Sequence, residues 1–558
     1  LRAAQGRVGW ISEGALNYVC RRLTVPPAEA YGVASFYALL STTPRPPNVA
    51  HVCDDIVCRL NGAETVCSGM ARALAADGTR GPSGWQRSPC LGLCDQAPAA
   101  LITRAGEPPV EHGMGRATTP SLLGAVRDAA GTALPATAAP LPQFGMAGLR
   151  LLRRIGHVDP TSLDDYRVHG GYEALRRAFH LGPEAVIREI TESKLLGRGG
   201  AAFPTGRKWD AVAKAPVRPH YLVCNADESE PGTFKDRIIM ERDPFALVEA
   251  MTIAAFAAGC ERGYLYVRGE YPLAAERLSG AIAAARARGL LGADVMGHGF
   301  RFDIELRRGA GAYICGEETA MFNSIEGLRG EPRNKPPFPT VAGLFGKPTV
   351  VNNVETLVNV LDIVLDTGPT FAALGTVGSS GTKLFCVSGH VARPGLYEVP
   401  FGTTLAALLE IAGGVPGGRH LRAVLLGGAA GSFVTPGELE VPLTFEGVRA
   451  IGASLGSGVV VALDESVDLW GLVLRIAAFF RDESCGQCVP CRVGTVRQEE
   501  ALRRLARREP LGSKGDEERL LAEIGQAMRD ASICGLGQTA AGAIASAVTK
   551  LGLLEGAP

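Results

Sequence analysis

The pattern of apolar and polar positions changes several times along the chain, and each change predicts a different kind of structure. Residues 15–40 have helical periodicity, and the Pro26-Pro27 pair predicts a break between two helices. A compact segment follows, with a strand-like start at residues 51–57 and an end near residue 102. Residues 129–142 are rich in Ala, Pro and Thr and have no charge pattern, so we predict a linker there.

The central third of the chain alternates between two periodicities. Residues 221–224 and 264–267 are strand-like, whereas residues 244–258 and 273–288 are helical. This alternation, from about residue 159 to about residue 368, predicts an α/β region. Short apolar runs with Gly then predict a small α+β module up to about residue 463. From residue 467 onward the pattern is helical apart from one cysteine-rich loop, which predicts a helical bundle.

Length and charge limit the class of protein. A chain of 558 residues exceeds the size of one hydrophobic core, so several domains are expected. Lys and Arg together number 57, as do Asp and Glu, so no basic excess supports nucleic-acid binding. The most apolar stretches, residues 246–260 and 469–480, are too short to span a bilayer. We expect a cytoplasmic protein without direct membrane insertion, although the chain begins at Leu1 and a targeting segment could precede it.

The fourteen cysteines indicate metal ligation rather than disulfides. Cys53 and Cys58 form one close pair, and Cys90 and Cys94 form another. Two such pairs can surround a small inorganic core with four thiolates. Their wide spacing favours an iron–sulfur cluster, while a zinc site or buried structural cysteines remain alternatives. Cys67 lies outside both pairs and is expected to be a buried thiol.

A second group of cysteines has a tighter pattern. Cys485, Cys488 and Cys491 are each separated by two residues, which is typical of three corners of a [4Fe–4S] cluster. Cys534 is the expected fourth ligand. Zinc or a disulfide fits three evenly spaced cysteines less well.

Four polar or glycine-rich runs are candidates for a cofactor site. Residues 197–206 read GRGGAAFPTG, and consecutive glycines let backbone amides approach a phosphate. NADESEPGTFKDR follows a strand-like run, where an open α/β sheet binds ligands. GAYICGEETA and NNVETL complete the set. Each run alone could equally be a turn, a solvated acidic face or a helix cap.

Two parts of the chain resemble known protein families. HVCDDIVCRLNGAE and SPCLGLCDQAPA resemble the thioredoxin-like [2Fe–2S] subunit of respiratory complex I. The resemblance implies a [2Fe–2S] cluster on Cys53, Cys58, Cys90 and Cys94. The four glycine-rich and polar runs, taken together, resemble the NADH-binding flavoprotein subunit of complex I, whose [4Fe–4S] cluster would lie on Cys485, Cys488, Cys491 and Cys534.

The second resemblance implies an FMN site and an NAD(H) site. The residues implied for FMN are Gly197, Arg198, Gly199, Gly200, Lys208, Asn225, Asp227, Glu228, Gly316, Glu317, Asn352, Asn353 and Thr356. Those implied for the dinucleotide are Phe203, Glu230, Glu318, Lys335 and Phe338. Glu318 near the adenosine ribose would favour NAD over NADP. Because FMN performs the hydride transfer, no catalytic side chain is expected. Ala202 and Ser229 stand where the family usually has glycine, and Ala211 where some relatives have phenylalanine.

The resemblance also implies the fold class and the domain order. We expect a multidomain α/β protein with a helical segment at residues 1–44 and a thioredoxin-like [2Fe–2S] domain at residues 45–128. A linker at 129–158 precedes a Rossmann-like FMN/NAD(H) domain at 159–370. A β-grasp-like, soluble ligand-binding module at 371–464 and a helical [4Fe–4S] domain at 465–558 follow.

The particular partner is inferred from the fusion of these parts and from the run MRDASICGLGQTA, which resembles NAD-dependent formate dehydrogenase β subunits. We therefore expect a partner α subunit that carries a molybdenum- or tungsten-pterin and further clusters. A hetero-oligomer is expected, with a dimer of heterodimers as one arrangement. The alternatives are the NADH dehydrogenase module of complex I and the diaphorase subunit of an NAD-linked hydrogenase. A self-contained NAD(P)H oxidase or a non-enzymatic electron carrier are weaker hypotheses.

Overall fold

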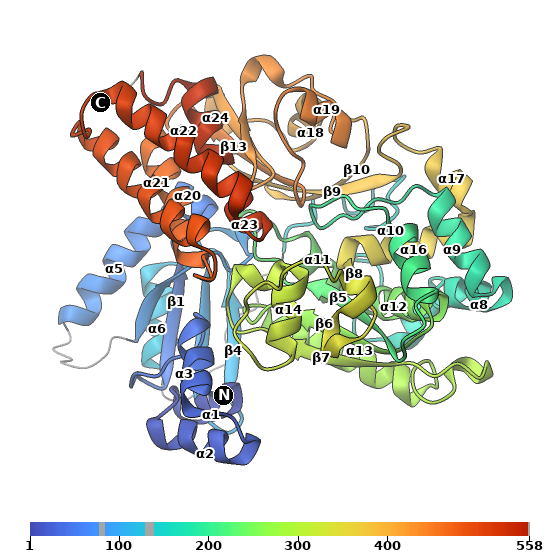
Figure 1. Cartoon of the computed structure of the whole chain (residues 1–558). Coiled ribbons are helices and arrows are strands. Elements are labelled where there is room, and N and C mark those ends of the chain that lie inside the picture. The colour runs from blue at the N-terminus through green and yellow to red at the C-terminus, as the bar shows by residue number, and fades with distance from the viewer. Residues whose placement is uncertain (77–83, 129–138, 556–558) are drawn as a thin grey trace.

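The N-terminal part of the chain begins with three helices, which a small mixed sheet with further helices follows. The computed structural model describes residues 1–76, 84–128 and 139–555 (Figure 1). The Pro26-Pro27 break predicted from the sequence separates the second and third helices. Strand β1 pairs in parallel with β2 and antiparallel with β3, in the order β2-β1-β3-β4. The elements are α1 (Arg2–Val8), α2 (Glu13–Leu23), α3 (Pro27–Phe36), β1 (Asn48–Cys53), α4 (Ile56–Leu60), α5 (Ala63–Ala76), β2 (Trp85–Ser88), β3 (Ala100–Arg104), β4 (Val110–Met114) and α6 (Thr119–Arg127).

The structure describes only part of the linker predicted at residues 129–158. Residues 129–138 of that prediction lie outside the described residues. From residue 139 to residue 162 the chain runs through turns and extended backbone, without a helix or strand. This stretch is nevertheless held in place, because Gln143 and Glu398 exchange hydrogen bonds of 3.1 and 2.6 Å between side-chain and backbone atoms.

The central region is built on a four-stranded parallel sheet in the order β7-β6-β5-β8. Its helix α12 is buried on nearly every side, which explains why its sequence has no polar face. The elements are α7 (Leu163–Val168), α8 (Glu173–Leu181), α9 (Pro183–Glu192), α10 (Thr205–Ala213), β5 (His220–Ala226), α11 (Lys235–Arg242), α12 (Pro244–Ala258), β6 (Cys260–Val267), α13 (Pro272–Ala287), β7 (Asp303–Arg308), η3 (Tyr313–Gly316), α14 (Glu318–Ile325), α15 (Pro339–Ala342), β8 (Thr349–Asn353), α16 (Val354–Asp366) and α17 (Gly368–Ala372).

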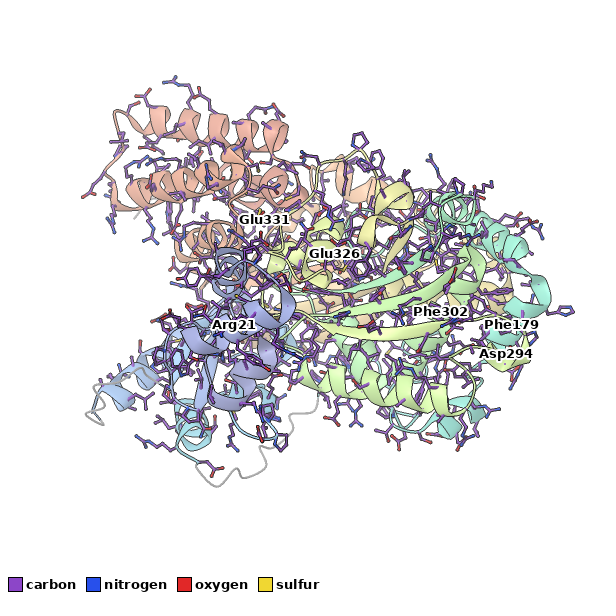
Figure 2. All side chains as sticks on the ribbon, turned by 60° about the horizontal axis from the view of Figure 1, so that its bottom comes forward. Arg21, Phe179, Asp294, Phe302, Glu326 and Glu331 are labelled. Carbon is purple, nitrogen blue, oxygen red and sulfur yellow. The ribbon has the colours of Figure 1, made fainter. Side chains whose placement is uncertain are left out.

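Aromatic side chains close one end of this region. Phe179, Phe256 and Phe300 make mutual edge-to-face contacts, and Phe302 stacks beside Phe300. Figure 2 shows Phe302 at the sheet and Phe179 farther out, on the side away from the C-terminal helices. These contacts close the sheet at that end with aromatic packing.

A second, five-stranded sheet forms the next module. Its strand order is β10-β9-β13-β11-β12, and β13 runs parallel to β9 while the other neighbours are antiparallel. The elements are β9 (Thr382–Gly389), β10 (Gly395–Pro400), α18 (Leu405–Ile411), β11 (Leu421–Leu426), β12 (Ser432–Val434), α19 (Phe445–Ala450) and β13 (Val459–Asp464).

The C-terminal region is helical, as the sequence predicts. It contains α20 (Leu469–Glu483), α21 (Val489–Arg507), α22 (Lys514–Ala531), α23 (Gly535–Thr539) and α24 (Gly542–Leu551). Figure 1 shows these helices beside both the five-stranded sheet and the N-terminal sheet. One continuous hydrophobic cluster runs from Ile56 and Cys90 through the parallel sheet to Leu536, so the regions share a core. Within the described ranges no helix is long and apolar enough to cross a membrane.

Candidate functional site

Two adjoining cavities lie at the carboxyl ends of the parallel strands. The larger has a volume of about 710 Å³ and the smaller about 390 Å³. Both are lined by Gly199, Asn225, Gly316, Glu317 and Asn353, so they share a wall. Every residue assigned to FMN or NAD(H) from the sequence lines one of the two cavities, except Arg198. The structure therefore brings together four runs that are far apart in the chain.

Strand register explains part of this convergence. Asn225 is the last residue but one of β5 and is the direct parallel neighbour of Asn353 at the end of β8. The carboxyl ends of parallel strands meet at one edge, where open α/β sheets bind ligands. The amide of the Asn225 side chain donates to the carbonyl of Gly316 at 2.8 Å and holds the GAYICGEETA run against β5.

The glycine-rich loop forms part of the wall of the larger cavity. Gly200 has a φ of +121°, a conformation that L side chains rarely adopt. Ala202, where the family usually has glycine, has a φ of +52° and accepts the steric cost of the left-handed region. The backbone amide of Arg198 donates to the hydroxyl of Thr356 at 2.8 Å, which fixes the loop to α16.

Arg198 is the one predicted cofactor residue that lines neither cavity. Its guanidinium donates to the carbonyl of Ser380 at 2.7 Å and lies 4.7 Å from the centre of the Phe401 ring. It therefore points toward the five-stranded module rather than into the cavities. The backbone of Arg198 remains beside the site.

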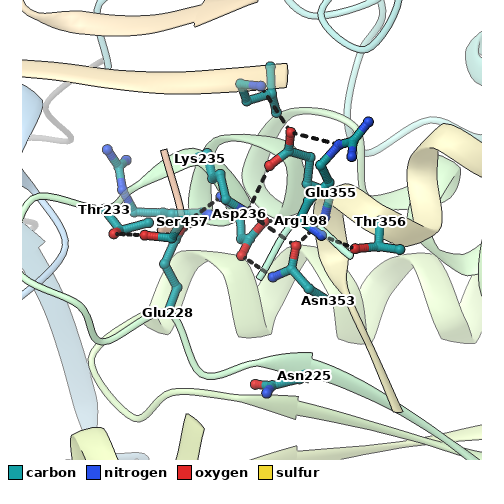
Figure 3. Close-up of polar contacts among 12 residues, drawn as sticks. Arg198, Asn225, Glu228, Thr233, Lys235, Asp236, Asn353, Glu355, Thr356 and Ser457 are labelled. Carbon is teal, nitrogen blue, oxygen red and sulfur yellow. Dashed lines mark hydrogen bonds and ion pairs between the residues drawn. The ribbon is translucent and has the colours of Figure 1, made fainter. Parts of the chain in front are cut away.

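A buried network of charges lies beside the smaller cavity (Figure 3). The Lys235 ammonium lies 2.7 Å from Asp236 and 3.1 Å from Glu355, and it donates to Asn353 at 3.1 Å. Asn353 in turn donates to Asp236 at 2.6 Å. Asn353 also caps α16, which confirms the helix-cap interpretation of NNVETL, while the cofactor interpretation stays a prediction.

Glu228 and Lys383 bring further titratable groups to this network. Glu228 accepts from the backbone amides of Asp236 and Arg237, at 2.8 and 2.9 Å, yet burial raises the pKa of its carboxyl to about 8. Lys383 begins the five-stranded module 3.6 Å from Glu355, and burial lowers the pKa of its ammonium to about 8. Lys235, Asp236 and Glu355 were not predicted as site residues, although all three lie inside motifs that the sequence displays.

Two exposed aromatic side chains line the larger cavity. Phe203 and Phe338 are 47% and 57% exposed, which is unusual for large apolar side chains and suits ring stacking. The Lys335 ammonium lies 2.8 Å from both Glu317 and Glu318 and neutralises part of their charge. The Lys208 ammonium donates to the carbonyl of Val351 at 2.9 Å, and burial lowers its pKa.

Glu230 lies in the smaller cavity, where three regions meet. It accepts a hydrogen bond of 2.6 Å from the Tyr313 hydroxyl and one of 2.9 Å from the backbone amide of Ala430. Burial raises the pKa of its carboxyl to about 7. Tyr313 was not predicted from the sequence, because nothing local to it indicates that it faces Glu230.

The first cysteine group is fully buried. Cys53 ends β1, Cys58 lies in α4, and Cys90 and Cys94 frame a short loop, with their sulfur atoms 3.5 Å apart. The backbone amide of Gly92 lies 3.4 Å from the Cys90 sulfur. Contacts with Cys53 and Cys94, followed by the charge of Arg268, hold the pKa of the Cys90 thiol well below its usual range. Four clustered thiols fit an iron–sulfur core.

Three of the four cysteines of the second group lie at helix N-termini, and Cys485 lies in the loop between α20 and α21. Cys488 caps α21, Cys491 lies in its first turn, and Cys534 caps α23. Helix N-termini favour negative charge, which suits thiolate ligands. None of these cysteines forms a disulfide. In residues 1–76, 84–128 and 139–555, no three His, Cys, Asp or Glu side chains are arranged to hold a single metal ion.

The two cofactor regions are contiguous. Cys534 and Gly535 line the larger cavity together with residues of the glycine-rich loop. A cluster held by Cys534 would therefore border the space lined by the predicted flavin residues, as an electron-transfer chain requires.

Four family models match the chain. The thioredoxin-like [2Fe–2S] ferredoxin model matches residues 1–112, and the Nuo51 FMN-binding domain model matches residues 190–362. The SLBB domain model matches residues 384–430, and the NADH-ubiquinone oxidoreductase-F iron-sulfur binding region matches residues 471–552. These matches confirm the predicted fold class and its sequence of modules.

Known proteins show the same similarity. The chain is 50% identical over 372 residues to the F 2 subunit of NADH-quinone oxidoreductase from Rhizobium meliloti, covering 66% of this chain and 88% of that protein. It is 44% identical to the HndC subunit of the NADP-reducing hydrogenase from Solidesulfovibrio fructosivorans, covering 69% of this chain and 78% of that protein. A crystal structure of an air-oxidised NAD⁺-reducing [NiFe]-hydrogenase is similar with a TM-score of 0.82 and 34% identity, covering 97% of this chain and 90% of that one.

The fold and the site together define an NAD(H)-dependent iron–sulfur flavoprotein. The chain belongs to the family of the NADH-quinone oxidoreductase F-type subunits, here joined to a thioredoxin-like [2Fe–2S] domain. It is an electron-transfer protein of diaphorase type, and its cofactors are FMN, NAD, a [2Fe–2S] cluster and a [4Fe–4S] cluster.

Proposed function

We propose that this chain exchanges electrons between NAD(H) and a partner subunit that oxidises formate. Bound FMN supplies the chemistry that links two-electron hydride transfer to single-electron transfer. The observation that carries the proposal is the convergence of the predicted flavin and nucleotide residues, apart from Arg198, on two adjoining cavities bordered by Cys534.

The flavin would be held mainly by backbone and amide groups. The glycine-rich loop offers amides to a phosphate, and Lys208 supplies a positive charge from the first turn of α10. Asn225, Asn352 and Asn353 provide donors and acceptors at the strand ends. Glu317 is committed to capping α14, where it accepts from the amides of Thr319 and Ala320, so it would orient the wall of the site.

The dinucleotide would lie between the two exposed phenylalanines. Stacking on Phe203 and Phe338 would orient the nicotinamide toward the flavin, which hydride transfer requires. Glu318, held by Lys335, would face the ribose and disfavour a 2′-phosphate. Glu230 would close the inner end, where it is fixed by Tyr313 and by the five-stranded module.

The clusters would connect this site to the partner. We propose Cys485, Cys488, Cys491 and Cys534 as ligands of the [4Fe–4S] cluster and Cys53, Cys58, Cys90 and Cys94 as ligands of the [2Fe–2S] cluster. The partner assignment rests on the fused order of the domains and on the Gly535-Leu536-Gly537 run after Cys534. The fused order is shared with some NAD-linked hydrogenases, whereas the run around Cys534 looks most like formate dehydrogenase β subunits, and the molybdenum- or tungsten-pterin would lie on the other chain.

A hydrogenase partner is the second candidate. It is favoured by one observation, which is that the NAD⁺-reducing [NiFe]-hydrogenase structure covers 97% of this chain. The two candidates share the chemistry at the flavin and differ only in the source of electrons.

Purification of the native complex followed by activity assays tests the proposal. The isolated chain should contain FMN and about six irons, two plus four for the two cluster types. It should reduce ferricyanide with NADH but leave formate unoxidised. The complex should reduce NAD with formate. Hydrogen-driven activity or quinone-reducing subunits in the complex would overturn the formate assignment, and absence of FMN and iron would overturn the whole proposal.

Two cysteine substitutions test whether electrons from formate pass through the [4Fe–4S] cluster. Cys491→Ser should abolish formate-driven NAD reduction and leave much of the NADH-to-ferricyanide activity, because small acceptors can take electrons from the flavin. Cys67→Ser is the control, since Cys67 is buried in the small core around β1 and outside both cysteine groups. Equal loss in both variants would contradict the ligand assignment.

A further inference from the structure

The loop between Cys90 and Cys94 is inserted into a socket on the FMN domain. Arg237, Arg268 and Tyr271 form this socket. The Arg237 guanidinium donates to the carbonyl of Gly92 at 2.9 Å and lies 2.6 Å from Asp95. Tyr271 lies over Gly92 so closely that a Cβ at that position would lie 2.1 Å from the tyrosine hydroxyl. The loop is therefore seated against the FMN domain by shape and by charge.

Arg268 joins this loop directly to the flavin site. One terminal nitrogen donates to the carbonyl of Cys90 at 2.6 Å, and the other donates to the carbonyl of Glu228 at 2.6 Å. The first carbonyl belongs to a proposed cluster ligand, and the second to a residue that lines the smaller cavity. Arg268 is 2% exposed and stands at the end of β6. A single guanidinium thus bridges two redox sites.

The charge of Arg268 is paired with one carboxylate. Glu270 lies 2.9 Å from the same guanidinium, and among the described residues its second oxygen has no hydrogen-bond partner. Both side chains line a cavity of about 270 Å³ that also borders Cys90 and Tyr313. In such a poorly solvated place, a fixed charge acts strongly on a neighbouring redox centre.

We propose that Arg268 is a positioning residue that fixes the [2Fe–2S] cluster against the flavin site, and that the Arg268–Glu270 pair sets the reduction potential of that cluster. This inference rests on the proposed assignment of Cys90 as a ligand. A [2Fe–2S] cluster held by these cysteines would carry one more unit of negative charge in its reduced state than in its oxidised state. The guanidinium stabilises that added charge, whereas the carboxylate opposes it.

The two members of the pair therefore have opposite predicted effects. Arg268→Gln removes the positive charge and leaves the Glu270 carboxylate unpaired, so the reduction potential of the [2Fe–2S] cluster should become more negative. Glu270→Gln removes the opposing charge, so the potential should become more positive. Arg268→Lys keeps the charge but cannot reach both carbonyls, so its potential should lie between wild type and Arg268→Gln.

The experiment is a redox titration of the full-length, cluster-loaded chain, with the [2Fe–2S] signal followed by electron paramagnetic resonance. Arg154→Gln is the matched control. Arg154 is also buried, pairs with an acidic residue (Asp243, at 2.8 Å) and lies over a tyrosine ring (Tyr166). Its partners belong to the core of the FMN domain and not to the loop between Cys90 and Cys94. This substitution should leave the potential unchanged. The [4Fe–4S] potential should move less than the [2Fe–2S] potential in every variant.

The outcomes separate three possibilities. Shifts of opposite sign in Arg268→Gln and Glu270→Gln support the inference. Unchanged potentials, or shifts of the same sign, overturn it and leave Arg268 with a structural role. If Arg268→Gln does not fold, Glu270→Gln and Arg268→Lys carry the same test. A wild-type chain without any [2Fe–2S] signal would instead overturn the proposed ligand assignment.

Discussion

The Glu398 carboxylate accepts a hydrogen bond from the backbone amide of Leu151 at 2.9 Å. It also accepts from the amides of Arg150 and Leu152, at 3.1 and 3.0 Å, and from the Thr382 hydroxyl at 2.8 Å. One buried side chain of the five-stranded module thereby holds the segment that leads into the FMN domain. We call this group the Glu398 clasp.

The clasp should contribute measurably to stability. Glu398→Gln replaces a charged acceptor by an amide whose nitrogen cannot accept, so it should lower the free energy of unfolding by about 2 kcal/mol. Thermal melting monitored by circular dichroism measures the loss. Glu410→Gln is the control, because Glu410 is exposed on α18 of the same module. Equal melting temperatures for the two variants would contradict the prediction.

Lys208 should retain the flavin phosphate. Lys208→Glu reverses a charge in a largely buried position, so FMN binding should weaken at least about tenfold. Flavin fluorescence released during gel filtration gives the retained fraction. Lys214→Glu, at the exposed end of the same helix, should retain FMN as the wild type does. The assignment fails if both variants retain FMN equally.

Glu318 should discriminate between the two dinucleotides. Glu318→Gln removes a negative charge that Lys335 already shares with Glu317, so the gain should be modest. We expect the NADPH-to-NADH ratio of kcat/KM to rise about fivefold, equivalent to about 1 kcal/mol. Steady-state assays with ferricyanide measure the ratio. Glu184→Gln, an exposed carboxylate on α9, should leave it unchanged, and an unchanged ratio in Glu318→Gln would place Glu318 away from the ribose.

Glu230 should give NADH oxidation a pH dependence. Its carboxyl pKa is raised to about 7 by burial, so the group is neutral below that pH and charged above it. The new negative charge should oppose the dinucleotide diphosphate, and KM for NADH should therefore rise as the pH increases through about 7. Glu230→Gln should remove this step. A pH profile of KM that keeps the step in Glu230→Gln would assign it to another group.

The candidate site could be predicted largely because it is built from strand ends and local runs. Asn225 and Asn353 lie in the last positions of strands that are otherwise mostly apolar, and parallel pairing places such ends at one edge. The helical C-terminal region and the Pro26-Pro27 break were also predictable from periodicity. Ala202 illustrates a finer point, since its positive φ gives a physical reason for the glycine that the family usually has there.

Contacts between regions could not be predicted in the same way. The direction of the Arg198 side chain depends on Ser380 and Phe401, which belong to another module. Tyr313, Arg268 and Glu398 likewise act on partners more than eighty residues away or in another region, and their own sequence surroundings carry no sign of it. Tertiary packing determines these contacts, and periodicity describes only one element at a time.

The salt bridge between Asp95 and Arg237 joins two domains of one chain, which affects how the protein behaves when it is diluted. Because both residues belong to one polypeptide, their encounter is intramolecular, with an effective concentration that can reach the millimolar range for a short tether. A contact of modest intrinsic affinity then stays closed at any protein concentration. Two separate polypeptides joined by the same contact would dissociate once diluted below its dissociation constant, whereas this chain should keep its [2Fe–2S] domain docked.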